Sequence, residues 1–277
     1  MTDDDAIARH YTTGDLATRI MAAARQAVPD LTRLTARDLA PVDEFHIGGI
    51  KATERFIPML GFAPGMAVLD VGSGIGGTAR YAAETCGCHV TGIDLTPEFC
   101  AVATMLSAAT GLADRTEFHE GSALVMPFAD GRFDAAMTLH VAMNIEDKQA
   151  LYREIARVLR PGATFGIFDI LEGPSPDPLD FPVPWAASQE TSHLASPEAM
   201  RTMLAEAGFA IEHEADRTGF AIEFFETMRQ AAAAADGPPP LGIHVIMDEG
   251  FKHKIANVAA NISAGRCGPW EFVCRRV

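Results

Sequence analysis

The chain has 277 residues, of which 48% are hydrophobic and 21% charged, a composition typical of a globular protein with one large core. Its net charge of −15 argues against a nucleic-acid substrate, because proteins that bind polyanions carry clustered Lys and Arg. No stretch approaches the ~20 apolar residues of a membrane span, so we expect no membrane segment. The acidic start Met1–Asp5 is unlike a secretory signal, and the five scattered cysteines predict buried free thiols in a reducing cytoplasm.

Residues 1–60 precede the first predicted core strand and have a mainly helical pattern. A first helix is indicated by apolar residues at helical spacing, namely Leu16, Ile20, Ala23 and Ala27. Thr35 and Asp38 have the spacing of a helix cap, and a second helix is expected there. A loop at 45–49 is followed by a helix from 50 to 60.

From residue 66 onward, predicted strands and helices alternate. Strands are expected at 66–71, 88–93, 115–119, 133–139 and 164–170, and helices at 78–86, 97–110 and 147–159. Such alternation predicts a parallel sheet with helices on both faces.

The pattern changes after Leu171. Five prolines between 172 and 184 exclude regular structure, and the aromatic residues Phe181 and Trp185 favour a packed lid on the substrate side. The later elements are expected as a helix capped by Ser196 and ended by Gly208, a strand at 209–217, helices at 219–235 and 243–264, and a strand at 270–275.

A glycine-rich turn follows the first predicted strand. Gly72, Gly74 and Gly77 satisfy the G-x-G-x-x-G pattern of dinucleotide-binding proteins, which is a weak signal by itself. Asp70 precedes the turn, where a pyrophosphate gains nothing from another negative charge. A ligand with a cationic ammonium and sulfonium gains a counter-charge there.

A second acid, Asp94, ends the next predicted strand about 20 residues after the loop, where a carboxylate can accept hydrogen bonds from ribose hydroxyls. Together, Asp70, the neutral glycine turn and Asp94 favour S-adenosylmethionine over NAD as the cofactor.

With these residues the sequence resembles the class I S-adenosylmethionine-dependent methyltransferases, over roughly residues 40–215. It is most similar to their small-molecule branch, the ubiquinone-biosynthesis and glycine/sarcosine-type enzymes. The resemblance is carried by the glycine loop, Gly92–Thr96, Gly121–Phe128 with Phe133 and Asp134, and Glu154–Ala163. It implies an α/β fold with a Rossmann-like, seven-stranded, mostly parallel sheet, helices on both faces and an N-terminal helical cap over the cofactor cleft.

On this basis we expect one methyltransferase domain over 1–277. It comprises a helical cap at 1–60, a cofactor-binding core at 61–218 that includes the lid-like loop 172–195, and a helical pair with a final strand at 219–277.

The resemblance also implies the cofactor contacts, which are Asp70, Gly72, Ser73, Gly74, Asp94, Leu95, Ser122, Ala123 and Leu139. Leu95 is expected against the adenine face. Ser122 stands where the family usually carries an acid that accepts from the adenine amine, and a serine accepts that bond without charge. The backbone N–H of Ala123 is available to the adenine ring, and carbonyls near Leu139 are available to the methionine ammonium.

His140 follows the fourth predicted strand, at the edge where open α/β sheets bind ligands. It is our candidate for a catalytic general base, and a buried structural histidine is an equally good interpretation. Tyr11, His46 and His193 are weaker candidates, and Trp185 is either an aromatic wall for an ammonium substrate or, more simply, part of the lid core. No residues have the spacing of a metal site.

The predicted function is transfer of a methyl group to an O, N, S or C atom of a small-molecule acceptor by in-line displacement, without a metal. The acidity is compatible with a neutral or cationic acceptor. Two alternatives are an S-adenosylmethionine-binding protein that has lost catalysis and acts as a regulator or partner subunit, and an NAD-dependent oxidoreductase.

Overall fold

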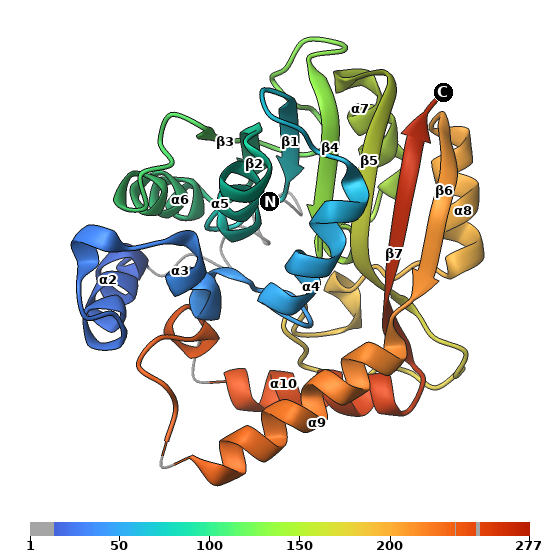
Figure 1. Ribbon diagram of the computed structural model, residues 1–277. Helices are drawn as coiled ribbons and strands as arrows, with labels where there is room; N and C mark the ends of the chain where they lie inside the picture. The colour runs from blue at the N-terminus through green and yellow to red at the C-terminus, as the bar shows by residue number, and fades with distance from the viewer. Residues whose placement is uncertain (1–13, 236, 248–249) are drawn as a thin grey trace.

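The computed structural model describes residues 14–235, 237–247 and 250–277, and a seven-stranded sheet forms its centre (Figure 1). The strands are β1 (Ala67–Val71), β2 (His89–Asp94), β3 (Thr116–Glu120), β4 (Phe133–Leu139), β5 (Leu159–Glu172), β6 (Phe209–Asp216) and β7 (Cys267–Arg276). They lie in the order β3-β2-β1-β4-β5-β7-β6. Because β7 is antiparallel to both its neighbours and the other pairings are parallel, the predicted mostly parallel sheet is confirmed.

The helices are α2 (Leu16–Ala27), α3 (Ala36–Asp43), α4 (Ile50–Phe56), α5 (Gly77–Cys86), α6 (Pro97–Ala109), α7 (Lys148–Val158), α8 (Pro197–Glu206), α9 (Thr218–Ala234) and α10 (Phe251–Ser263). Short 3-10 turns lie at Leu31–Arg33, Ile57–Leu60, Ala142–Asn144, Gln189–Thr191 and Ile243–Val245.

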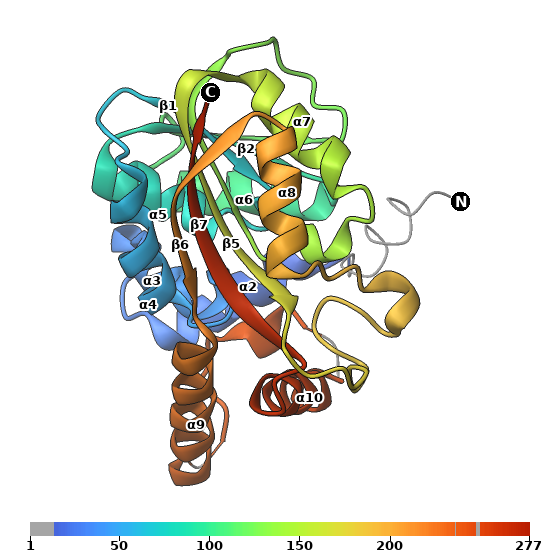
Figure 2. The same ribbon diagram turned by 90° about the vertical axis from the view of Figure 1, so that its right-hand side faces the viewer.

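Alternation along β1 sends its side chains to opposite faces of the sheet. Leu69 and Val71 join a core cluster with residues of α7 and α8, whereas Val68 joins a second cluster with residues of α4 and α5. In the edge-on view of Figure 2, α4 and α5 lie on one side of the sheet and α7 and α8 on the other. The prediction of helices on both faces is therefore confirmed.

The N-terminal helices pack beside this core. Leu16 and Ile20 of α2 form a buried cluster with Phe99 of α6. Helix α3 begins at the predicted cap, because Thr35 Oγ accepts from the Asp38 N–H while the Asp38 carboxylate accepts from the Thr35 N–H at 2.9 Å. Its first turn is thereby satisfied.

Four predicted boundaries are wrong by more than two residues, and one of them is the start of the last strand, which lies at Cys267 rather than 270. Strand β5 begins at Leu159 rather than 164, because Leu159 already pairs with Phe133 of β4. The helix expected over 50–60 becomes a 3-10 turn after Phe56, where Pro58 has no N–H to donate. The helix expected over 243–264 is α-helical only from Phe251, after Gly250 at its N-cap, because glycine disfavours a helix interior.

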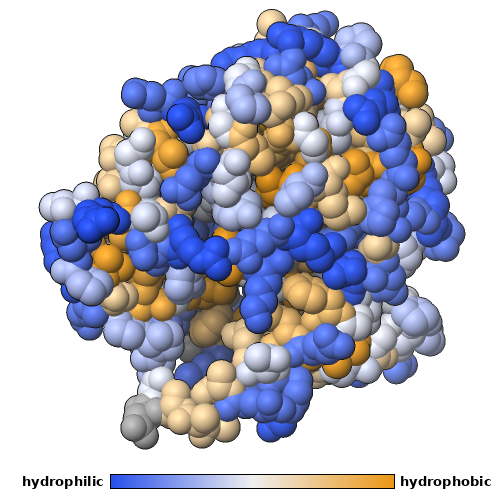
Figure 3. All heavy atoms as spheres, in the orientation of Figure 1, coloured by the Kyte–Doolittle hydropathy of each residue, from blue (hydrophilic) through white to orange (hydrophobic). Residues whose placement is uncertain are grey.

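The helical pair α9 and α10 forms a lobe at the lower end of the molecule in Figure 1. Helix α9 buries only Ala221 and leaves Ile222 and Met228 exposed. In Figure 3, apolar surface gathers on this lower lobe, and a hollow separates it from the α2–α3 corner.

The loop 172–195 packs beneath the sheet edge instead of standing free. Trp185 is buried with Ile47, Met143 and Ile170, and its Nε1–H donates to Ser192 Oγ at 3.0 Å. Trp185 therefore belongs to the core of this loop, as the simpler interpretation expected.

Candidate functional site

The predicted site residues come together around one cavity of about 290 Å³ at the carboxyl edge of β1, β2 and β4. All ten line it, namely Asp70, Gly72, Ser73, Gly74, Asp94, Leu95, Ser122, Ala123, Leu139 and His140. In a parallel sheet the carboxyl ends of neighbouring strands meet at one edge, and the ligands of such folds bind there.

The glycine turn leaves β1 by a path that only glycine takes easily. Gly72 has φ 72°, and a Cβ at this position would lie 2.3 Å from Val141 Cγ2. Gly74 has φ 53°, but a Cβ there would meet nothing within 4 Å. Gly72 is thus required for packing against the segment after β4, whereas the space beside Gly74 belongs to the cavity.

Asp94 is oriented by backbone donors on both sides. Its Oδ2 accepts from the Gly74 N–H at 2.8 Å and its Oδ1 from the Thr96 N–H at 2.9 Å. Burial raises the pKa of Asp94, and these two hydrogen bonds oppose the rise. The carboxylate is therefore held in one orientation at the cavity wall, with its remaining lone pairs available to a ligand.

Asp70 is 3% exposed, and none of the described residues donates a hydrogen bond to its carboxylate. Burial, followed by the charges of Asp94 and Glu44, raises the pKa of Asp70 to about 8. Ser73 Oγ is also buried in this wall without a partner among the residues described. Unpartnered buried polar groups are costly, so these atoms fit a ligand that brings a cation and polar groups.

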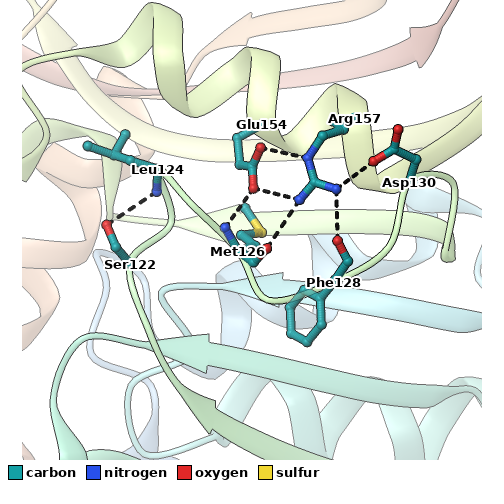
Figure 4. A network of polar contacts seen from close by, with 7 residues as sticks. All are labelled: Ser122, Leu124, Met126, Phe128, Asp130, Glu154 and Arg157. Atoms are coloured by element: carbon teal, nitrogen blue, oxygen red, sulfur yellow. Dashed lines mark hydrogen bonds and ion pairs between the residues drawn. The ribbon is translucent and has the colours of Figure 1, made fainter.

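A network behind the cavity holds the loop that contains Ser122 (Figure 4). Glu154 Oε1 accepts from the Met126 N–H at 2.6 Å, and Arg157 donates to the carbonyls of Met126 and Phe128 at 3.2 and 2.8 Å. Arg157 also donates to Glu154 and Asp130, so it joins helix α7 to both ends of the turn. The predicted helix motif at 154–163 thus supports the loop 121–128.

The Ser122 hydroxyl uses one of its two lone pairs within its own loop. Its Oγ accepts from the Leu124 N–H at 3.3 Å, within its own turn. The hydroxyl proton is still able to face the cavity, and a second lone pair is left on Oγ.

The surroundings of His140 differ from those expected of a general base. Its Nδ1 lies 3.2 Å from the Phe168 carbonyl, and its Nε2 accepts from the Ile47 N–H at 3.3 Å. Burial and then the neighbouring His46 lower the pKa of His140 to about 3, and the hydrogen bond to the Phe168 carbonyl opposes this fall. These contacts favour the structural interpretation that the sequence left open, because both ring nitrogens already have partners.

The N-terminal helices contribute wall residues that the motifs did not reveal. Asp43 and Phe45 line the cavity together with His46, which had been only a weak candidate. His46 is neutral, since burial lowers its pKa to about 4, and its Nε2 lies 3.2 Å from Thr53 Oγ. The expectation that this cap reaches the cavity agrees with these contacts, and no local sequence signal marks the residues individually.

Asp43 is paired behind the wall. It lies 2.7 Å from Arg80 Nη2, and both side chains are almost completely buried. Burial raises the pKa of Asp43, and Arg80 opposes the rise. Arg80 of α5 thus compensates the negative charge of Asp43. The N-terminus of this helix faces the cavity.

The remaining candidates lie elsewhere. His193 and Trp185 do not line the cavity, and Tyr11 lies outside the described residues. Within the described ranges, no three His, Cys, Asp or Glu side chains are grouped as metal ligands, and no helix is long and apolar enough to cross a membrane.

A seven-stranded sheet with an antiparallel β7 between β5 and β6, a glycine turn after β1 and acids ending β1 and β2 together define the class I methyltransferase architecture. Residues 69–167 match the family described as Methyltransferase domain. Residues 69–167 therefore carry a methyltransferase domain, as the motifs indicated.

Among curated proteins, the chain is 38% identical over 112 residues to a sterol 24-C-methyltransferase of Gibberella zeae, covering 40% of this chain and 30% of that protein. It is 34% identical over 171 residues to phosphoethanolamine N-methyltransferase 1 of Arabidopsis thaliana, covering 62% and 34%. The chain thus spans about a third of the length of these relatives.

Among solved structures, geranyl diphosphate C-methyltransferase from Streptomyces coelicolor, in complex with S-adenosyl-L-homocysteine, aligns with a TM-score of 0.72 at 18% identity, covering 100% of this chain and 98% of that one. The [4+2]-cyclase SpnF aligns with a TM-score of 0.70 at 20% identity, covering 100% and 97%. These likenesses confirm the fold. Because one neighbour is named as a cyclase, the reaction has to be argued from the site.

Proposed function

We propose that this protein is an S-adenosylmethionine-dependent methyltransferase acting on a small-molecule acceptor. The observation that carries the proposal is the pair Asp70 and Asp94, which lie at the carboxyl ends of adjacent parallel strands and line one cavity together with an open glycine turn. A buried carboxylate without an internal donor suits a cationic ligand, and an oriented carboxylate suits a pair of hydroxyls.

In this assignment Asp70 provides the counter-charge for the methionine ammonium and Asp94 accepts from the ribose hydroxyls. The Leu139 carbonyl also faces the ammonium, while Leu95, Ser122 and the Ala123 N–H contact the adenine. Gly72, Ser73 and Gly74 allow the ligand to approach the backbone. When bound, S-adenosylmethionine would supply a methyl group activated by its sulfonium charge, for transfer to an electron pair of an O, N, S or C atom of the acceptor.

The chain's own task is then alignment and exclusion of water, and positioning of this kind can lower a barrier by ~7–11 kcal/mol. A general base is needed only for an acceptor that is protonated at rest. His140 remains the predicted base for that case, although the Ile47 N–H occupies its Nε2 lone pair.

The charge of the cavity lining favours some acceptor charges over others. Five carboxylates line it, namely Asp43, Asp70, Asp94, Glu146 and Asp147. Arg80 compensates Asp43, and Asp70 has a raised pKa, so the exposed Glu146 and Asp147 carry most of the uncompensated charge. Like charges in a cleft repel a phosphate. We therefore propose a neutral or cationic acceptor, rather than a phosphorylated one or a nucleic acid.

The domain division and the compartment belong to the same proposal. The unit 1–277 with its cap, core and C-terminal pair is supported by cap residues in the cavity wall. A cytoplasmic location is supported by five free cysteines, of which four are buried.

Calorimetric titration with S-adenosylhomocysteine tests the cofactor assignment. We expect micromolar binding by the parent and a loss of at least about tenfold, or ~1.4 kcal/mol, in Asp94→Ala. Glu120→Gln is the matched control, since Glu120 ends β3 on the same edge but is exposed and does not line the cavity. Absence of binding by the parent would overturn the proposal.

Two further measurements separate the alternatives. Binding of NADH in place of S-adenosylhomocysteine would support an oxidoreductase. Binding of the cofactor without turnover on any member of a broad acceptor panel would support a regulatory or partner protein.

A further inference from the structure

His140 has a backbone conformation that side chains rarely adopt. Its φ is 56°, and it is the one residue other than glycine with positive φ in the described part of the chain. Such conformations persist only where surrounding contacts hold them, and they cluster at functional sites. The contacts that hold His140 therefore indicate what its side chain does.

The ring is held from two sides. The His140 N–H donates to the Phe168 carbonyl at 2.7 Å, and Nδ1 faces the same carbonyl at 3.2 Å. A carbonyl only accepts, so Nδ1 carries the proton and Nε2 carries the lone pair. That lone pair accepts from the Ile47 N–H, across 93 positions of sequence.

Ile47 lies in the segment 45–49 that joins α3 to α4. Phe45 and His46 of this segment line the cavity, and the His46 ring lies 5.8 Å from the His140 ring. Phe168 packs edge-on against His140 at 4.8 Å and against His46 at 5.9 Å. The end of β4, the centre of β5 and the N-terminal segment thus meet at one imidazole.

We propose that His140 is a positioning residue whose side chain ties the segment 45–49 to the end of β4 and so keeps Phe45 and His46 in the cavity wall. The tie is a property of the free protein. Its consequence, slower escape of the bound cofactor, rests on the proposed function.

Three substitutions at His140 separate the effect of its backbone conformation from the effect of its side-chain contacts. His140→Gly accepts φ 56° without strain and removes only the ring. His140→Asn also tolerates this conformation, but its amide ends at the level of Nδ1 and does not reach Ile47. His140→Gln carries an amide oxygen as far along the side chain as Nε2, and we expect it to restore part of the tie.

The first readout is amide hydrogen exchange of the free protein. We expect exchange in 45–49 to become about 2–10-fold faster in His140→Gly and His140→Asn, the effect of one net hydrogen bond, and to recover partly in His140→Gln. Leu204→Ala is the control for lost stability, because Leu204 is fully buried on the opposite face of the sheet. Unchanged exchange at 45–49 in both His140→Gly and His140→Asn, or equal acceleration in Leu204→Ala, would overturn the tie.

The second readout is the dissociation rate of S-adenosylhomocysteine, measured by stopped flow. We expect the same two variants to release it about 2–10-fold faster, with Leu204→Ala unchanged. Parent protein that fails to bind this ligand contradicts the proposed function, and the exchange experiment still decides the tie. A parent that binds, with variants that release at the parental rate, contradicts only the effect on retention.

Discussion

The Gly74 N–H donates to Asp94 Oδ2 at 2.8 Å, and this hydrogen bond joins the two sequence motifs that predicted the cofactor. It links the turn after β1 to the end of β2, so the conformation of the glycine turn and the orientation of the Asp94 carboxylate are set together. Changes in the turn are therefore expected to alter ligand affinity as well as stability.

Alanine substitutions at Gly72 and Gly74 should distinguish a glycine that is needed for packing from one that is needed for ligand binding. Both positions have positive φ, which costs a non-glycine residue ~1–2 kcal/mol. In Gly72→Ala the new Cβ also meets Val141, and overpacking adds ~1–3 kcal/mol, so we expect a large fall in melting temperature.

Gly74→Ala should lower the melting temperature less and weaken S-adenosylhomocysteine binding more, because Gly74 lines the cavity and a Cβ there would meet no protein atom within 4 Å. Val141→Ala should partly restore Gly72→Ala and leave Gly74→Ala unaffected. Thermal denaturation and calorimetry of the parent, the two single variants and the two double variants decide this, and equal behaviour of the two single glycine variants would contradict it.

Asp70→Asn should stabilise the free protein and weaken the cofactor complex. The folded state raises the pKa of Asp70 from 3.8 to about 8, so the native protein holds this proton more tightly than the unfolded chain. Its contribution to stability is therefore present at low pH and is lost as pH rises through the window between these values.

We accordingly expect the variant to melt higher than the parent at pH 8, by about 2–4 °C for each kcal/mol, and equally at pH 4. Affinity for S-adenosylmethionine should fall about 10–100-fold, as for a lost charged hydrogen bond. Melting curves from pH 4 to pH 8 with parallel titrations test both halves, and a variant that melts lower at pH 8 would contradict the argument.

Arg157→Lys should loosen the loop 121–128 without unfolding the domain. Arg157 donates to two loop carbonyls and two carboxylates, and a lysine ammonium does not reproduce this planar fork. We expect S-adenosylhomocysteine affinity to fall about 3–10-fold, or ~0.6–1.4 kcal/mol. Arg153→Lys, on an exposed position of the same helix, is the control and should bind normally.

Acceptors without phosphate should be preferred over their phosphorylated counterparts. Suitable pairs are ethanolamine with phosphoethanolamine and geraniol with geranyl diphosphate, scored by S-adenosylhomocysteine release. If a compound turns over, we expect it to be the unphosphorylated member, because carboxylates line the cavity.

The double variant Glu146→Gln with Asp147→Asn should reduce this discrimination, most clearly at low salt. Asn at 147 keeps the ability to accept from the Ala150 N–H at the start of α7. Glu84→Gln with Glu206→Gln removes the same charge at exposed positions away from the cavity and should leave discrimination intact. Preferred turnover of phosphorylated compounds by the parent would refute the charge argument.

Much of the core architecture was predictable from local sequence. The glycine turn, the acids at 70 and 94 and the Thr35 cap each depend on neighbours within a few residues, and the alternation of strands and helices indicated the order of elements. Predicted boundaries were less accurate where long-range pairing decides the end of an element. Strand β5 is an example, because its first residue, Leu159, pairs with Phe133 of β4.

What the sequence determined by itself is the set of residues at the carboxyl edge of the sheet, because a parallel strand that ends in an acid or a glycine turn delivers it there whatever surrounds it. Only the tertiary structure decided the state of those residues. The pKa of Asp70 depends on burial beside Asp94 and Glu44, and the proton position of His140 depends on Phe168 and Ile47. Desolvation and hydrogen bonding between distant segments exist only after folding, so no local pattern encodes them.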